Sequence, residues 1–281
     1  MSMRCALHLF VLAASLLTTS TLVGQELRVF TVTRDVTQAS EKAGERAPIV
    51  SRSLTLFHAG KVYDYIDILR EVTIFEPTHR RFTILNESAA AYSIVSQDEL
   101  RQFLSLAETR ARELAGDLLR QDTGDQRNSV EFLQFQLRPE FKTSYDSATR
   151  RLRLETPSFG YDVVCVAPPQ PTILEPYLRY ADAMAELNAV LHPQSLLPAP
   201  RLELNRQLRN QGVLPISVRR SMSFGQRQEL VAEHEWKGAL TELDRQLISG
   251  WESQLTKGQV RELTFEQLQR AVLTGKLVSQ R

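Results

Sequence analysis

Two histidines and one aspartate are the residues whose types and spacing best suit acid–base chemistry. His58 and His79 lie in segments typical of hairpin turns, and Asp64 lies between them in the chain. An imidazole beside a carboxylate acts as a general base near neutral pH. If both turns meet at one rim of a sheet, a hydrolase that uses His58, Asp64 and His79 is one hypothesis. The alternative is that these side chains are polar because turns face solvent.

Other catalytic and metal-binding patterns are missing from the sequence. Neither a Gly-x-Ser-x-Gly elbow nor a glycine-rich phosphate loop occurs. His234-Glu235 begins like a zinc-binding helix, but Gly238 stands where the second histidine belongs. The other histidines are scattered along the chain, so we expect no metal and no other cofactor.

Aromatic side chains near the two turns suit an apolar ligand. The candidates are Phe57, Tyr63, Tyr65 and Phe75, together with Phe103 further along the chain. Aromatic residues are also common at half-buried strand positions, so a role in the hydrophobic core is the alternative.

The stretch Arg52–Ser96 positions these residues and has the pattern of two successive β-hairpins. Short runs rich in β-branched and aromatic residues flank turns at 58–61 and 76–79. Pro77 suits a turn because it has no backbone N–H to donate to a ladder. Both faces of the second hairpin carry apolar side chains, so each face needs a cover.

A long amphipathic helix is expected over 97–120. Ser96 and Glu99 have the spacing of a capping box. Apolar residues then recur at steps of three and four and form one stripe: Leu100, Phe103, Leu104, Ala107, Ala111, Leu114 and Leu118. We expect this helix to cover one face of the second hairpin.

The remainder of the chain divides at the proline-rich segment 167–171. Before it, alternating apolar residues predict strands at 133–137, 152–154 and 161–165, with Cys165 as a small buried hydrophobe. After it, the predicted helices are 176–191, 202–210, 241–255 and 264–273, and the segment 213–236 is interpreted as a β-hairpin, with a helix at 227–237 as the alternative.

These elements predict an α+β fold. Strands and helices do not alternate regularly, which favours a curved, mostly antiparallel sheet, an incomplete barrel, packed with helices and followed by a helical C-terminal third. The expected division is a signal peptide at 1–25, the sheet with its long helix at 26–166, and a mainly helical extension at 167–281 that packs on the sheet.

The first 25 residues have the layout of a secretory signal peptide. Arg4 precedes an apolar run over 6–17, and small and polar residues follow. The run is shorter than the roughly 20 residues of a membrane-spanning helix, so we expect no transmembrane segment in the mature chain. The expected location is the periplasm or the exterior of the cell. Only Cys165 remains after cleavage, which predicts no internal disulfide.

The charge balance bears on partners. Removal of Arg4 with the leader leaves as many Lys and Arg residues as the 33 Asp and Glu residues. A neutral chain lacks the basic field that holds nucleic acid, so we expect no nucleic-acid partner.

Three segments carry a family resemblance. They are Leu56–Tyr65 (LFHAGKVYDY), Glu71–Pro77 (EVTIFEP) and Arg80–Leu85 (RRFTIL). With the leader, they resemble uncharacterised exported bacterial proteins of a kind common in planctomycetes. The strand rhythm from Val29 to Val166 is also similar to lipoprotein-carrier-like domains, which implies a half-barrel that binds a lipid or acyl chain and carries no catalytic residues. The helical C-terminal third departs from that pattern.

The sequence is consistent with three hypotheses about function. The first is an exported, non-enzymatic binding or envelope-associated module that holds an apolar ligand between the strands of 52–85 and the helix of 97–120. The second is the secreted hydrolase described above. The third is a protein-interaction scaffold with an envelope protein as its partner.

Overall fold

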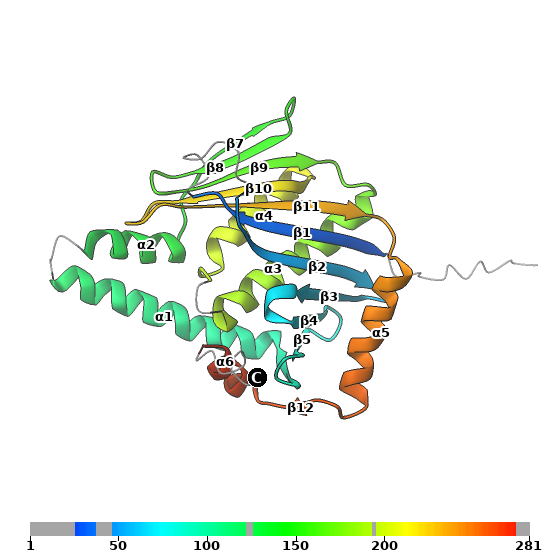
Figure 1. The fold of residues 1–281 in the computed structure, drawn as a ribbon. Coiled ribbons are helices and arrows are strands. Elements are labelled where there is room, and N and C mark those ends of the chain that lie inside the picture. The colour runs from blue at the N-terminus through cyan, green and yellow to red at the C-terminus, as the bar shows by residue number, and fades with distance from the viewer. Residues whose placement is uncertain (1–25, 38–46, 122–125, 193–194, 274–281) are drawn as a thin grey trace, which may run out of the picture.

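The computed structural model describes residues 26–37, 47–121, 126–192 and 195–273 (Figure 1). The expected signal peptide at 1–25 lies outside the described residues. The described residues form one 12-stranded sheet with helices on both of its faces. None of the helices in these ranges is long and apolar enough to span a membrane.

Two antiparallel meanders make up the sheet and meet where β1 pairs with β11. The first meander consists of β1 (Leu27–Asp35), β2 (Ile49–His58), β3 (Lys61–Ile66), β4 (Glu71–Glu76), β5 (Arg81–Asn86) and β6 (Ala91–Ser96). The second consists of β7 (Lys142–Asp146), β8 (Arg151–Glu155), β9 (Phe159–Val166), β10 (Leu214–Met222) and β11 (Gln228–Lys237). A short strand, β12 (Arg261–Glu262), pairs with β6 in parallel. The sheet is curved and open, with β12 and β7 as its edges (Figure 1).

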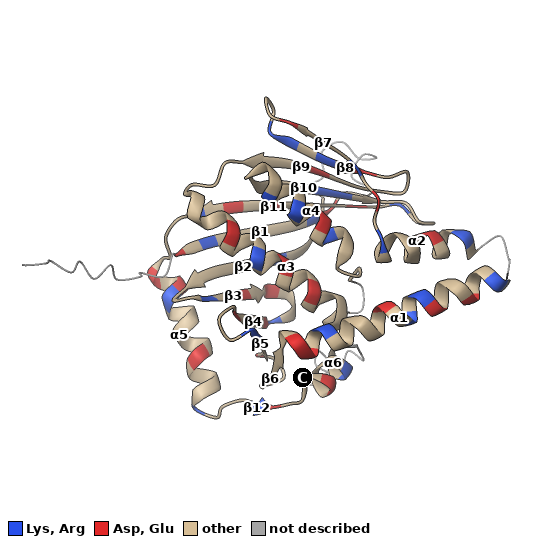
Figure 2. Ribbon diagram, turned by 180° about the vertical axis from the view of Figure 1, so that it is seen from behind, with Lys and Arg blue, Asp and Glu red and all other residues tan. Residues whose placement is uncertain are grey.

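The helices occupy three places around this sheet. Their bounds are α1 (Gln97–Gln121), α2 (Arg127–Leu137), α3 (Leu174–Leu191), α4 (Ala199–Gln211), α5 (Glu242–Thr256) and α6 (Phe265–Leu273). Helices α3 and α4 lie over one face of the sheet (Figure 2), and α5 packs on the other face. Helices α1 and α2 connect the two meanders. Short 3-10 turns occur at Asp67–Leu69 and Pro171–Ile173.

The second hairpin, β4–β5, is covered on both faces, as its two-sided apolar pattern requires. Phe75 belongs to the core cluster that includes Leu178 of α3. Ile74, its neighbour on the opposite face, packs in a separate cluster with Trp251 of α5. The alternation of side chains along a strand therefore divides the apolar residues between two helices.

The expectation that the 97–120 helix covers this hairpin holds only for the first turns of α1. Helix α3 also contacts the hairpin: Arg179 donates to the backbone carbonyl of Pro77 at 3.5 Å, and His192 at the end of α3 lies 3.4 Å from Glu71. Helix α1 contributes Leu100 and Leu104 from its first turns to the core. Farther along, Leu114 is 49% exposed, and the helix packs there on α2. Acidic and basic residues both recur along the length of α1 (Figure 2).

The predicted strand at 133–137 is also wrong, because these residues form the end of α2. Val130, Leu133 and Leu137 are spaced by three and four residues, as on one face of a helix. The same segment also shows the alternation typical of a strand. The aromatic ring of Phe135 packs on that of Phe159 in β9, with 4.7 Å between the ring centroids. This long-range contact fixes α2 on the sheet.

Turn and capping signals led to the correct elements. Both hairpins of the stretch 52–96 form, and the hydroxyl of Ser96 accepts the backbone N–H of Glu99 at 3.1 Å. The segment 213–236 forms the hairpin β10–β11 rather than the alternative helix. This hairpin lies between β9 and β1, so residues 167–281 and 26–166 contribute to one sheet.

A cavity between the sheet and helices α3 and α4

The two histidines of the predicted catalytic group have separate partners. His58 lies 3.4 Å from the carboxylate of Glu26, and His79 lies 3.1 Å from that of Glu76. His79 is largely exposed. The two hairpin turns do reach the same rim of the sheet, where His58 and Pro77 line a pocket of about 260 Å³.

Asp64 is remote from both imidazoles because it faces α3. Its strand partner Thr55 donates a hydrogen bond of 2.7 Å to its carboxylate, and the hydroxyl of Tyr180 lies 3.4 Å from Thr55. Burial raises the pKa of Asp64 to about 6, and the nearby charge of Glu71 adds to the shift. The structure therefore does not assemble His58, Asp64 and His79 into one catalytic group.

The five aromatic ligand-binding candidates are packed inside the molecule. Phe57 meets Tyr180 edge to face, and Phe75 stacks on Phe82 at 4.9 Å. The other three have these partners: Tyr63 and Tyr65 stack on Trp251, Tyr63 donates to Glu252 at 2.6 Å, and Phe103 packs on Phe265. Of the five, only Phe57 is among the residues lining the rim pocket.

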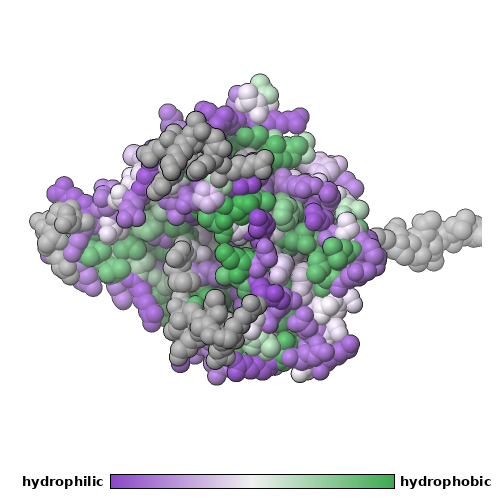
Figure 3. Space-filling view, viewed as in Figure 1, coloured by the Kyte–Doolittle hydropathy of each residue, from purple (hydrophilic) through white to green (hydrophobic). Residues whose placement is uncertain are grey.

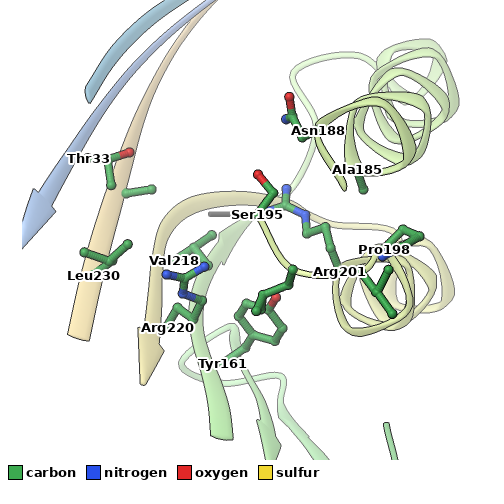
Figure 4. A pocket seen from close by; sticks show the side chains of 13 residues that line it. Thr33, Tyr161, Ala185, Asn188, Ser195, Pro198, Arg201, Val218, Arg220 and Leu230 are labelled. Atoms are coloured by element: carbon green, nitrogen blue, oxygen red, sulfur yellow. The ribbon is translucent and has the colours of Figure 1, made fainter. Parts of the chain in front are cut away.

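A cavity of about 290 Å³ lies on the same face of the sheet as α3 and α4 (Figure 4). It does not lie between the strands of 52–85 and the 97–120 helix, where a ligand was expected. Its apolar walls come from both sides: Val218, Leu230 and Ala232 on the sheet, and Ala185, Leu196, Leu197 and Pro198 on the helical side. Its polar lining consists of Thr33, Tyr161, Asn188, Ser195, Arg201 and Arg220. Apolar side chains also reach the surface in the middle of the face seen in Figure 3, with polar residues around them.

Strand pairing places the sheet residues of this cavity side by side. Arg220 of β10 pairs with Tyr161 of β9 on one side and with Leu230 of β11 on the other. Directly paired residues of antiparallel strands share a face of the sheet, so these three side chains all point toward the helices. The next row along the strands contributes Val218 and Ala232 in the same way.

The helical wall is held by contacts from three helices. Ala185 and Asn188 are one turn apart on α3, and Arg201 is in the first turn of α4. The backbone N–H of Leu197, in the segment between them, donates to the side chain of Gln136 on α2 at 2.9 Å. Gln136 is buried, so α2 fixes this segment from outside the cavity.

Arg220 is incompletely bonded. Its Nη2 donates to Gln228 at 2.8 Å, while its Nε is buried and has no partner among the described residues. Burial lowers the pKa of Arg220, but a guanidinium keeps its charge at neutral pH because its ordinary pKa is so high. The amide oxygen of Asn188, across the cavity, is likewise buried without a partner in the described chain.

Arg201 supplies a second positive charge with neutral partners. Its Nε donates to the amide oxygen of Asn205 at 3.0 Å, and its guanidinium also bonds the hydroxyl of Tyr177. Burial raises the pKa of Tyr161, and the charges of both Arg201 and Arg220 oppose that shift. Both guanidinium groups therefore lie close enough to Tyr161 to act on the same hydroxyl.

His234 lies one row beyond the cavity on the same face of β11. Its Nδ1 is 2.8 Å from the hydroxyl of Thr31, and its Nε2 is buried without a partner in the described part of the chain. Burial and then the charge of Arg201 lower the pKa of His234 to about 3. The imidazole is therefore neutral at pH 7 and adds no charge to the site.

Sequence reasoning missed Arg201, Arg220 and Asn188. A local signal existed for one of them, because Arg220 alternates with Val218 and Met222 on the face that β10 turns toward the interior. A charged residue at such a position points either to a buried partner or to a ligand.

The described residues contain no group of three or more His, Cys, Asp and Glu side chains that could hold a metal ion. No protein-family model matches the sequence, and no curated protein matches it either.

Proposed function

We propose that this chain is an exported, non-enzymatic binding protein that holds a small, partly apolar molecule between the sheet and helices α3 and α4. The observation that carries this proposal is the cavity of about 290 Å³, two of whose lining residues, Arg220 and Asn188, each carry a buried polar atom without a partner among the described residues. Small-molecule sites are typically concave, lined by apolar side chains, and equipped with a few polar groups that orient the ligand.

The unpaired polar atoms argue against an accidental packing gap. Nearly all buried polar groups in folded proteins have a hydrogen-bond partner, because leaving one unpaired costs about 1–3 kcal/mol. Two such atoms, on Arg220 and Asn188, belong to residues that line the same cavity. A ligand with polar atoms at one end is expected to bond the polar groups of these two residues.

The size of the cavity limits the ligand class. Small-molecule sites usually have volumes of about 300–1,000 Å³, so this cavity is at the lower end of the range. It suits a short amphiphile rather than a long-chain lipid.

A substitution that fills the cavity tests the proposal. Ala232→Phe is expected to abolish the binding of octanoate and of 1-octanol, measured by isothermal titration calorimetry. Glu233→Phe is the matched control, since Glu233 is the next residue of β11 and its side chain is exposed. We expect it to bind as the unchanged protein does. Absence of binding of both probes to the unchanged protein, or equal binding to the Ala232→Phe variant, contradicts the proposal.

Export has its own test. The chain expressed with residues 1–25 in a bacterial host is expected in the periplasm or the medium, with an intact mass that lacks the leader. A protein of full-length mass in the cytoplasmic fraction contradicts export, and it does not bear on the proposal that the cavity binds a ligand.

A further inference from the structure

We propose that the natural occupant of this cavity is an organic anion, a carboxylate or phosphate on a short apolar tail, whose head group binds Arg220 and Arg201. This inference rests on the proposed binding function and names the chemical class of the ligand. It follows from the charges around the cavity, which the described residues leave uncompensated.

Arg220 lacks an acidic partner. The bond recorded for its guanidinium goes to the neutral amide of Gln228, and no ion pair joins it to another described residue. Its neighbour Arg219 behaves differently, because it points to the other face of β10 and pairs with Glu229 at 3.2 Å. The charge of Arg219 is therefore compensated on the exposed face of the sheet, whereas the charge of Arg220, beside the cavity, has no counter-charge among the described residues.

Arg201 is in the same situation. Its recorded partners, Asn205 and Tyr177, are neutral. Asp182, which Asn205 links to this network, already accepts from Asn205 at 2.8 Å and from Arg209 at 2.9 Å. The described residues that line the cavity include two arginines and no Asp or Glu.

Burying a positive charge without a counter-charge is unfavourable, so proteins pair such groups or bring them to a ligand. The planar guanidinium offers N–H donors in a fork that matches the two oxygens of a carboxylate or phosphate. Figure 4 shows Arg201, Arg220 and Tyr161 lining one cavity, so both guanidinium groups belong to its wall. The apolar side chains of Leu230, Val218 and Ala232 continue the same wall and suit the tail.

The test compares three probes with the same eight-carbon tail on the unchanged protein: octanoate, octyl phosphate and 1-octanol. Isothermal titration calorimetry at pH 7.5 and low salt is expected to show at least tenfold tighter binding of one or both anions than of the alcohol. The tighter of the two anions identifies the head group. This comparison needs no variant and so does not depend on how a substitution folds.

Variants then assign the preference to a residue. Arg220→Met keeps the length of the side chain and removes its charge, and we expect it to bind octanoate and 1-octanol with similar affinity. Arg219→Met is the matched control on the opposite face and is expected to retain the tenfold preference.

Three results contradict the inference in distinguishable ways. Equal affinity of the unchanged protein for the anions and the alcohol refutes the charge argument and leaves the binding function standing. Binding of none of the three probes refutes both. A preference for the anions that survives in Arg220→Met also contradicts the assigned role of Arg220.

Discussion

Arg220 has a location that a purely structural residue rarely occupies. Its charge is desolvated, its Nε has no recorded partner, and the side chain packs beside Tyr161 rather than against an acid. A binding site commonly keeps such unfavourable groups because the ligand compensates them, at a cost to the stability of the empty protein.

The empty protein is therefore expected to tolerate the loss of this charge. Replacing a buried, poorly compensated charge by an apolar side chain of similar volume is often neutral or stabilising. We expect Arg220→Met to match or exceed the unchanged protein in its free energy of unfolding, measured by urea denaturation without ligand. Arg219→Met, on the exposed face, is expected to change it by less than about 0.5 kcal/mol. A loss of more than about 2 kcal/mol in Arg220→Met alone indicates a structural role instead.

Asp64 gives the fold a dependence on pH. Its pKa in the folded chain is about 6, above its ordinary value of 3.8, so folding disfavours the ionised carboxylate. The stability that Asp64 contributes is therefore fully present only well below its unfolded pKa of 3.8 and is lost as the pH rises through 6. Asp64→Asn removes the ionisable group and is expected to be more stable than the unchanged protein at pH 8, by about 3 kcal/mol.

The difference between these two proteins is expected to shrink to about 0.5 kcal/mol near pH 4, where Asp64 is protonated in the folded state and close to half protonated in the unfolded state. Thermal unfolding followed by circular dichroism at both pH values measures it. A constant difference at pH 4 and pH 8 contradicts the raised pKa, since a packing effect of the amide does not depend on pH.

At the scale of elements, local signals were sufficient where a capping residue or a turn defined the boundary. A helix was predicted over 241–255, and Thr241 forms a reciprocal capping box with Asp244 at the start of α5. The strand prediction at 133–137 failed because the apolar residues of that segment satisfy two periodicities. The packing of Phe135 on the distant Phe159, which local sequence does not reveal, decides between them.

The capping box of α5 is open to a direct test. The hydroxyl of Thr241 accepts the backbone N–H of Asp244 at 3.2 Å, and Asp244 also receives a bond of 3.3 Å from Arg28 of β1. We expect Thr241→Ala to lower the free energy of unfolding by about 1–2 kcal/mol. Thr256→Ala, at the exposed end of the same helix, is the control and is expected to cost clearly less. Equal losses in urea denaturation show that the cap adds no specific stability.

At the scale of the whole molecule, the sequence allowed the α+β class and the curved antiparallel sheet to be predicted, but not the position of the site. The cavity depends on the pairing of β10 with β9 and β11, and of β1 with β11. These pairings join residues that are up to about 200 positions apart in the chain. Turn residues and hydrophobic periodicity determine neighbours in sequence and do not determine such long-range pairing. The contribution of α3 to the cover of the second hairpin was missed for the same reason, since α3 follows that hairpin by almost 90 residues.

Because both meanders share one sheet, we expect them to unfold together. The chain has two tryptophans, Trp236 on β11 of the second meander and Trp251 on α5 against the first. In each single-tryptophan variant, Trp236→Phe and Trp251→Phe, fluorescence and far-ultraviolet circular dichroism are expected to give the same urea midpoint. Midpoints that differ between the two methods within one variant indicate that the two halves unfold separately.

An experimental structure of the protein with octanoate tests the central claim most directly. We expect the molecule between β9–β11 and helices α3 and α4, with its carboxylate within hydrogen-bonding distance of the Arg220 guanidinium and its tail against Leu230 and Ala232. The account is contradicted if octanoate binds elsewhere, or if the cavity contains no octanoate at a saturating concentration.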